Sequence, residues 1–249
     1  MTAIARLLAA EFCKARATPT LWWLLAGTLL LTGGVVGGGY VVANLDHLAP
    51  QSGAGLQDGL HAVGVGTILG QIAGIIGMAG EYRFGQADQT FLSTPRRGRL
   101  VTAKAVVYTA IGAVFGLASA AMALMVSWSY LGIRGIGLPM HQSLLWETLG
   151  GAVLSAALST LLGVAVGALL RNQVVAIVTV LGVETIVETA VFQASTTIGR
   201  WLPGESAGAI RRFPADGLLS PSAGVIVLAL WAAALLALGY RQVLGRDVS

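Results

Sequence analysis

The chain has 249 residues, of which 55% are hydrophobic and only 10% are charged, and its formal net charge is +4. The mean hydropathy of +0.78 is far above that of an ordinary water-soluble domain. No soluble basic domain is present that could bind nucleic acid, so the positive charge has to serve another purpose. We therefore expect an all-α integral membrane protein.

Six apolar runs approach or exceed the roughly 20 residues with which a helix crosses about 30 Å of hydrocarbon. They are continuously apolar and rich in Leu and Ala, which excludes the alternating strands of a membrane barrel. The six predicted spans are residues 21–43, 60–80, 105–130, 148–170, 174–194 and 223–240. Little sequence remains between them, so residues 1–249 are predicted to form one transmembrane domain.

The basic residues predict the orientation of the bundle. If the N-terminus is cytoplasmic, 11 of the 15 Lys and Arg fall on the cytoplasmic side, namely Arg6, Lys14, Arg16, Arg83, Arg96, Arg97, Arg99, Lys104, Arg171, Arg241 and Arg246. The other side holds Arg134, Arg200, Arg211 and Arg212. The positive-inside bias thus places both termini of a six-span protein in the cytoplasm.

Residues 1–20 precede the first span and carry apolar side chains at helical spacing, at Ile4, Leu7, Leu8 and Phe12. Arg6 and Lys14 are available to lipid headgroups, which indicates an interfacial helix lying on the membrane. A frayed basic terminus is the alternative.

The segment 81–104 joins the second and third predicted spans. One helical face carries Phe84, Ala87, Phe91 and Leu92, whereas Arg83, Gln86 and Thr90 occupy another. Pro95 ends this helix, and the basic turn 96–99 follows. Such a short amphipathic helix either inserts its apolar face into a groove of another protein or rests on lipid.

In this segment the chain resembles the membrane (permease) subunits of type-2 ATP-binding-cassette (ABC) transporters, most of which are exporters. The residues that carry the resemblance are Glu81, Gly85, Phe91, Leu92, Pro95, Arg96, Arg97, Arg99 and Lys104. The short basic tail 240–248 is also similar to the ending of these subunits.

The resemblance implies that residues 81–94 form a coupling helix that docks on a separate cytoplasmic ATP-binding subunit. The implied ATPase contacts are Glu81, Arg83, Phe84, Gly85, Ala87, Phe91, Leu92 and Pro95. It also implies two short re-entrant helices in the broken apolar segment 195–222, and a second copy or paralogue of the membrane subunit. A prokaryotic plasma membrane is the expected location.

The chain contains no motif with which it could hydrolyse ATP alone. A phosphate-binding loop needs Gly-Lys followed by Ser or Thr, but the two lysines, Lys14 and Lys104, each precede an alanine. We expect no metal site either, because the three histidines lack matching Cys or carboxylate spacing. ATP and Mg²⁺ are accordingly expected on the partner ATPase, with no cofactor on this chain.

Two acidic residues, Glu184 and Glu188, lie one turn apart within the fifth predicted span. An acidic side chain at mid-membrane costs on the order of 2.5 to 3.5 kcal/mol, so both should face protein or water. The functional hypothesis is that they line the substrate path or the dimer interface together with Thr185 and Thr189. A hydrogen-bonded structural pair is the alternative.

Glycines recur every four residues in the second predicted span, at Gly66, Gly70 and Gly74. This spacing gathers small residues on one helix face, where a neighbouring backbone can approach closely. We interpret these glycines as helix-packing positions.

The leading hypothesis is the permease subunit of an ABC exporter, driven by a separate ATPase. One alternative is a proton-coupled secondary transporter that uses Glu184 and Glu188, although no internal repeat relates the two halves of the chain. The other is a non-transporting membrane scaffold or immunity protein. The transported substrate and the direction of transport stay open.

Overall fold

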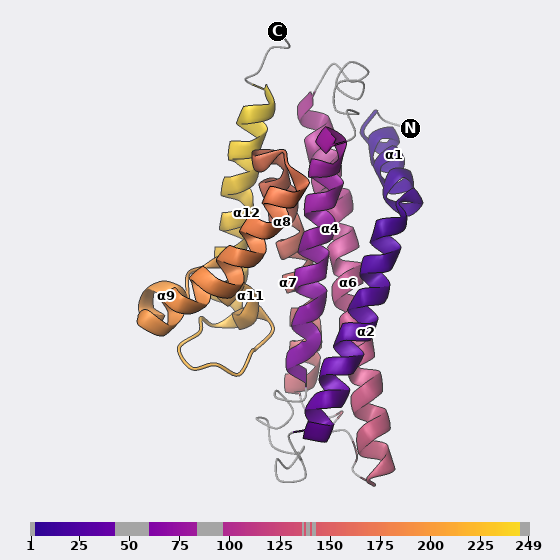
Figure 1. The fold of residues 1–249 in the computed structure, drawn as a ribbon, viewed down its shortest axis with the longest axis vertical. Helices are drawn as coiled ribbons and strands as arrows, with labels where there is room; N and C mark the ends of the chain where they lie inside the picture. Colours follow the sequence, from indigo (N-terminus) through magenta and orange to yellow (C-terminus); the bar gives the residue numbers. More distant parts are fainter. Residues whose placement is uncertain are drawn as a thin grey trace.

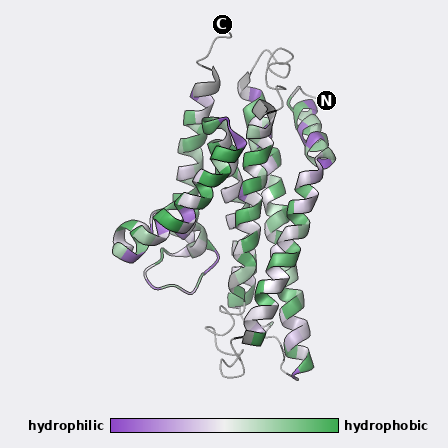
Figure 2. Ribbon diagram, in the orientation of Figure 1, coloured by the Kyte–Doolittle hydropathy of each residue, from purple (hydrophilic) through white to green (hydrophobic). Residues whose placement is uncertain are grey.

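The computed structural model describes residues 3–42, 60–83, 97–135, 137, 140 and 143–244, and these residues form an all-helical bundle (Figure 1). Hydrophobic residues extend along the length of the long helices (Figure 2). Within this part of the chain, five helices are long and apolar enough to cross a membrane, namely Pro19–Val41, Gly98–Ile133, Ser143–Leu170, Gln173–Ala194 and Pro221–Arg241. The prediction of a multi-pass helical membrane protein is confirmed.

The second predicted span corresponds to α4 (Gly64–Arg83), which follows the short 3₁₀ helix η1 (His61–Val63). Its apolar part, Gly64–Gly80, is shorter than the five candidate spans. The helix nevertheless lies inside the bundle, where it packs against α6 (Arg97–Ile133) and α7 (Ser143–Leu170). By length and composition the described residues have five spans, and a sixth crossing at α4 stays a prediction.

The three predicted packing glycines lie where α4 meets its two neighbours. A Cβ atom on Gly66 would stand 2.7 Å from the backbone oxygen of Phe115 in α6. On Gly70 it would stand 2.7 Å from Thr160 Oγ1 in α7, and on Gly74 it would collide with the Thr160 carbonyl. Backbones this close leave no room for a side chain, so α4 is wedged between α6 and α7.

Several predicted boundaries differ from the structure. Helix α6 begins at Arg97, not at Ala105, so the last part of the expected coupling segment belongs to this helix. Hydropathy marks only the apolar part of a helix, and Lys104, which borders that part, lies within α6 and pairs with Glu11 of α1. Helix α7 likewise begins at Ser143 instead of 148, and α12 (Pro221–Leu244) extends beyond the predicted 223–240.

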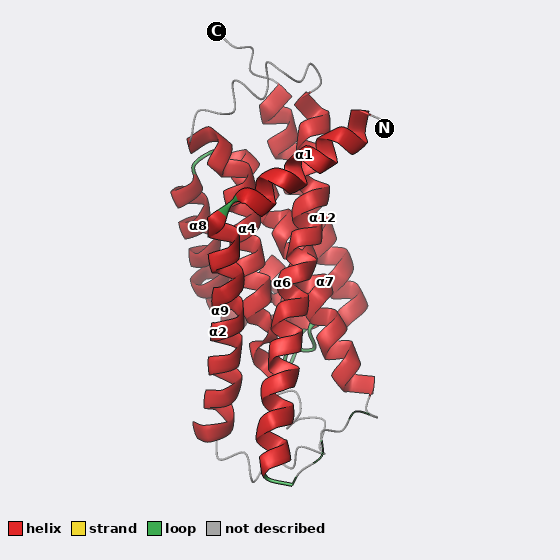
Figure 3. Ribbon diagram, turned by 90° about the vertical axis from the view of Figure 1, so that its right-hand side faces the viewer, coloured by secondary structure: helices red, strands yellow, loops and turns green. Residues whose placement is uncertain are grey.

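The N-terminal helix α1 (Ala3–Ala17) is separated from α2 (Pro19–Val42) by Thr18. Pro19 lacks a backbone N–H and disfavours helical geometry in the residue before it, so the chain bends here. Figure 3 shows α1 running obliquely to the bundle axis instead of continuing α2. Contacts with α6 bury one side of α1, including Glu11 and Ala15.

The fifth predicted span is one helical rod with an irregular centre, made of α8 (Gln173–Gly182), η2 (Val183–Glu188) and α9 (Thr189–Ala194). A two-residue turn separates it from α7. Arg171 adopts the left-handed conformation there, and Asn172 Oδ1 accepts hydrogen bonds from the amides of Val174 and Val175 at 3.0 and 3.1 Å. The rod slopes away from the bundle toward α9 (Figure 1).

Two short helices occupy the segment 195–222, α10 (Thr196–Gly199) and α11 (Pro203–Ile210). Helix α11 packs against α7 and α12, and its last residues abut the backbone of Gly151 in α7. Their re-entrant insertion into a membrane stays a prediction. Helix α1 and the C-terminal end of α12 lie at the same end of the bundle, as expected for termini on one side (Figure 1).

Candidate functional site

The two acidic residues of the fifth span lie in η2, a turn of π-helix that widens the rod by one residue. Such turns occur as single insertions in α-helices and are frequent at functional sites. Glu188 is 1% exposed and Glu184 is half-buried. Thr185 and Thr189 are exposed, and the Thr185 hydroxyl donates to the Leu181 carbonyl at 2.5 Å. The structure thus brings the glutamates toward the bundle and turns both threonines outward.

Glu188 binds the beginning of α11. Its Oε2 accepts a hydrogen bond from the Gly204 amide at 2.7 Å, one of the amides that a helix N-terminus leaves unpaired. A Cβ atom on Gly204 would lie 2.7 Å from the same oxygen, so a larger residue at this position would displace the carboxylate. The other oxygen, Oε1, is buried and has no hydrogen-bond partner among the described residues. This carboxylate therefore keeps a free acceptor in the protein interior.

Glu184 binds α4. Its Oε1 accepts a hydrogen bond of 2.7 Å from Nε2 of Gln71, which is 1% exposed. Gln71 lies between two of the packing glycines, and its backbone oxygen abuts Gly163 of α7. The amide is therefore held in position, and the π-turn is tied to the centre of the bundle.

The positive charge of the cluster comes from Arg211 at the end of α11. Its Nη1 donates to Thr67 Oγ1 at 3.0 Å, and that hydroxyl is 3.1 Å from Ser155 Oγ. Burial lowers the pKa of Arg211 to about 10, against the opposing effect of Glu184 and Glu205, so the guanidinium remains charged at neutral pH. Burial also raises the pKa of Glu205.

Four ionisable residues thus gather between α4, η2 and α11. Three are carboxylates, from Glu184, Glu188 and Glu205, and one is the Arg211 guanidinium. With every group ionised, the cluster carries excess negative charge, which suits a proton or a cationic group of a ligand. In the part of the chain that the structure describes, no three His, Cys, Asp or Glu residues are placed to hold a metal ion.

A second buried charge pair lies near the N-terminal end of the bundle. Lys104 Nζ of α6 is 2.6 Å from Glu11 Oε2 of α1 and donates to the Gly77 carbonyl of α4 at 3.2 Å. Both side chains are almost completely buried. Lys14, which is half exposed, binds the other Glu11 oxygen at 3.0 Å. Three helices, α1, α4 and α6, are thereby joined at one ammonium group.

The expected coupling segment is described only at its two ends. Glu81 and Arg83 lie in the last turn of α4, and Arg97 begins α6. The remaining predicted ATPase contacts lie outside the described residues, namely Phe84, Gly85, Ala87, Phe91, Leu92 and Pro95. The docking role of this segment stays a prediction.

No protein-family model matches the chain, and no match is found among curated proteins. The family resemblance therefore depends on the residues of the segment 81–104 and on the tail.

Sequence reasoning missed Gln71, Glu205, Arg211 and Glu11, which belong to the two clusters. A signal existed for Gln71, because an amide within an apolar helix needs a partner. None existed for Arg211 and Glu11, whose partners are distant in the sequence.

Proposed function

We propose that this chain is the permease subunit of an ATP-driven exporter, forming the translocation pathway and using a separate cytoplasmic ATPase as its motor. The observation that carries the proposal is the position of α4. One end of this helix leads into the segment that resembles a coupling helix, and its middle holds Glu184 through Gln71.

A movement applied at the coupling segment has a short path to the buried carboxylates. Gly77, which accepts from Lys104, and Gln71 are six residues apart on α4, or about 9 Å along the axis. Because a hydrogen-bonded helix is a rigid element, displacement of one end of α4 along its axis moves the whole helix. That displacement alters the distance between Gln71 and Glu184, and with it the contact between η2 and α11.

A second membrane subunit fits the exposed faces of two candidate spans. In each of the helices 19–41 and 173–194, the most apolar stretch of 18 residues is mostly exposed. Only 22% of this stretch in 19–41 and 17% in 173–194 is buried within the chain. These faces contact lipid or a second copy or paralogue, as the family resemblance implies. ATP and Mg²⁺ belong to the ATPase in this proposal, and the membrane is a prokaryotic plasma membrane.

One observation favours a second candidate, a proton-coupled secondary transporter. Glu188 is 1% exposed and its Oε1 has no partner in the described structure, as expected for a carboxyl group that exchanges a proton. The two candidates differ in their energy source. If the chain is a proton-coupled transporter, the purified protein in proteoliposomes should dissipate an imposed pH gradient, and Glu188→Gln should abolish this dissipation. An ATP-driven permease should leave the gradient intact.

The deciding experiment is purification from native membranes in mild detergent, with identification of co-purifying proteins and measurement of ATP hydrolysis. We expect an ATPase that is recovered with the unmodified chain and lost at least about tenfold with Arg83→Glu/Phe84→Asp, because a charge reversal and a buried charge disrupt an apolar docking face. The control Arg134→Glu makes the same charge reversal directly after α6, at the end of this helix that is remote from the coupling segment. Absence of an ATPase from folded protein, or equal loss in the control, contradicts the proposal.

A further inference from the structure

An apolar groove of about 340 Å³ lies at the bend where α1 meets α2 and α6. Phe12 and Arg16 line it from α1, Trp22 from α2, and Val114 and Phe115 from α6. Phe12, Trp22 and Val114 are each more than half exposed. The space is far larger than one water molecule needs, and its largely apolar walls offer water few partners. An extended hydrocarbon is the occupant that these walls favour.

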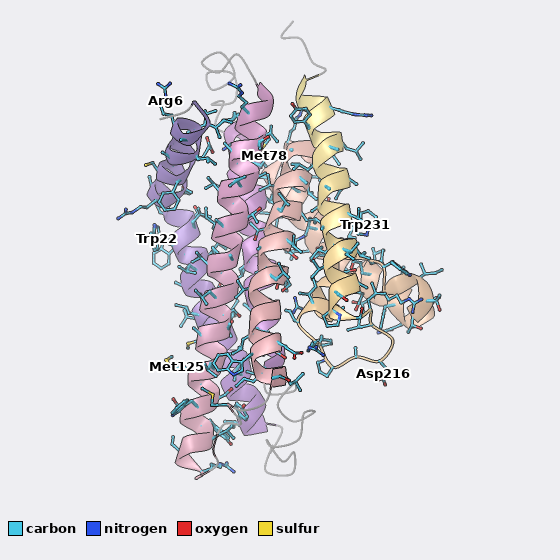
Figure 4. All side chains as sticks on the ribbon, turned by 180° about the vertical axis from the view of Figure 1, so that it is seen from behind. Arg6, Trp22, Met78, Met125, Asp216 and Trp231 are labelled. Carbon is cyan, nitrogen blue, oxygen red and sulfur yellow. The ribbon has the colours of Figure 1, made fainter. Side chains whose placement is uncertain are left out.

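The groove lies at the level where a membrane changes from hydrocarbon to headgroups. Arg16 precedes the first residue of the span, Pro19, by less than one helical turn. The Trp22 indole donates to the Arg16 carbonyl at 2.9 Å and faces outward from α2 (Figure 4). Tryptophan with one polar end occupies this interface in membrane proteins. A hydrocarbon in the groove therefore has its polar end near Arg16.

The charge at this end is positive. Arg16 is the one charged residue among those that line the groove. Helix α1 carries three basic residues, Arg6, Lys14 and Arg16, against one acid, Glu11, whose carboxylate is bound to Lys104 and Lys14. An anionic headgroup complements this surface, and a guanidinium pairs well with phosphate oxygens.

We propose that this groove binds one anionic phospholipid, with an acyl chain between α1, α2 and α6 and the phosphate on Arg16. Such a lipid fills the space beneath the bend and fixes the angle of α1. Because Glu11 joins α1 to Lys104 and Gly77, the bound lipid also stabilises the junction of α1, α4 and α6.

Quenching of Trp22 by brominated lipid tests the site directly, because bromine quenches indole fluorescence only in near contact. A protein that retains Trp22, with the other five tryptophans changed to Phe, is placed in phosphatidylcholine vesicles. Brominated phosphatidylglycerol or brominated phosphatidylcholine is then titrated. We expect half-maximal quenching at a mole fraction about fivefold lower for phosphatidylglycerol, the preference that one basic side chain gives for an anionic lipid.

The neighbouring Trp23, 77% exposed and not part of the groove, provides the matched control. A protein that retains only Trp23 should show no preference.

Arg16→Gln should abolish the preference at Trp22, whereas Arg6→Gln should leave it intact, and Val114→Phe should reduce quenching by narrowing the groove. Equal quenching by both lipids at Trp22, the same preference at Trp23, or equal effects of Arg16→Gln and Arg6→Gln would overturn the proposal. If the multiple Trp replacement does not fold, native mass spectrometry of the chain with and without Arg16→Gln compares bound phosphatidylglycerol.

Discussion

The Glu11 carboxylate binds two lysines in very different surroundings. Its Oε2 contacts buried Lys104 and its Oε1 contacts Lys14, whose side chain is 49% exposed. A charge taken out of water needs its partner, whereas an exposed pair is screened and contributes little. The same acid should therefore be coupled strongly to one lysine and weakly to the other.

We predict that Glu11→Met lowers the free energy of unfolding by about 3 to 5 kcal/mol, because it leaves the Lys104 ammonium buried without its carboxylate. Reversible unfolding in mixed detergent micelles, followed by tryptophan fluorescence, measures this change. Lys14→Met should cost at most about 1 kcal/mol. The double variant Glu11→Met/Lys104→Met should recover part of the loss, and purely additive effects would show that the pair is not coupled.

For the buried carboxylates we predict that Glu184→Gln and Glu188→Gln each lower ATP hydrolysis by the assembled complex at least about tenfold, because the carboxamide removes the negative charge and weakens the hydrogen bond from about 1.5 to 3 kcal/mol for a charged acceptor to about 0.5 to 1.5 kcal/mol for a neutral one. The carboxamide keeps an acceptor for the Gly204 amide, so expression and assembly should be retained. Glu147→Gln, which makes the same change at a half-exposed carboxylate paired with Arg212 outside this cluster, is the matched control. Normal ATP hydrolysis in both Gln variants would show that the two glutamates form only a structural pair.

Helix α4 has close backbone contacts with α6 and α7, and its glycines are not equivalent. Gly74 faces the Thr160 carbonyl of α7, whereas a Cβ atom on Gly80 would meet nothing within 4 Å. We predict that Gly74→Ala destabilises the bundle by about 1 to 3 kcal/mol through overpacking. Gly80→Ala should be neutral or slightly stabilising, because alanine is the better helix former. Thermal unfolding in detergent compares the two variants, and equal midpoints would contradict the wedged packing of α4.

The helical rod 173–194 shows which properties of a helix the local sequence predicts and which it does not. Its position and apolar character follow from composition, but the π-helical turn at its centre does not. Nothing in Val183 to Glu188 forbids a regular α-helix. The turn coincides with contacts to Gln71 and Gly204, which are remote in the chain. The periodicity of apolar residues cannot predict contacts between segments that are remote in the chain.

The early start of α6 has a similar explanation. Lys104 ends the apolar run, so composition places the membrane span after it. The structure continues the helix back to Arg97, and Lys104 within it pairs with Glu11 of α1. Hydropathy therefore predicts the apolar part of a helix, but it predicts neither the residue at which the helix begins nor the partner of a charged residue at the border.

At the scale of the whole molecule, the helical class and the single bundle were predictable because an apolar chain in lipid must satisfy its backbone internally. The prediction that Glu184 and Glu188 face protein instead of lipid followed from the cost of acid in hydrocarbon. Their partners did not, because Gln71, Gly204 and Arg211 come together only when α4, η2 and α11 have packed.

The orientation of the bundle is open to a direct test. One end of the bundle carries α1, the C-terminus of α4, the N-terminus of α6 and the C-terminus of α12 (Figure 1). Basic residues that are predicted to be cytoplasmic lie on these parts of the described helices. We predict that this end faces the cytoplasm. Cys13 is the one cysteine of the chain, so Cys13→Ser gives a cysteine-free background for labelling. Exposed positions Arg6 and Arg241 report on this end, and exposed Gly137 reports on the other.

In intact cells a membrane-impermeant maleimide should label Gly137→Cys and spare Arg6→Cys and Arg241→Cys, and inverted vesicles should give the reverse. Labelling of Arg6→Cys and Arg241→Cys from opposite sides would require an odd number of crossings, and would mean that α4 does not cross the membrane. Labelling of both from outside would keep an even number and reverse the orientation, leaving the segment 84–96 unable to reach a cytoplasmic ATPase. Only the expected pattern is compatible with both six crossings and the proposed motor.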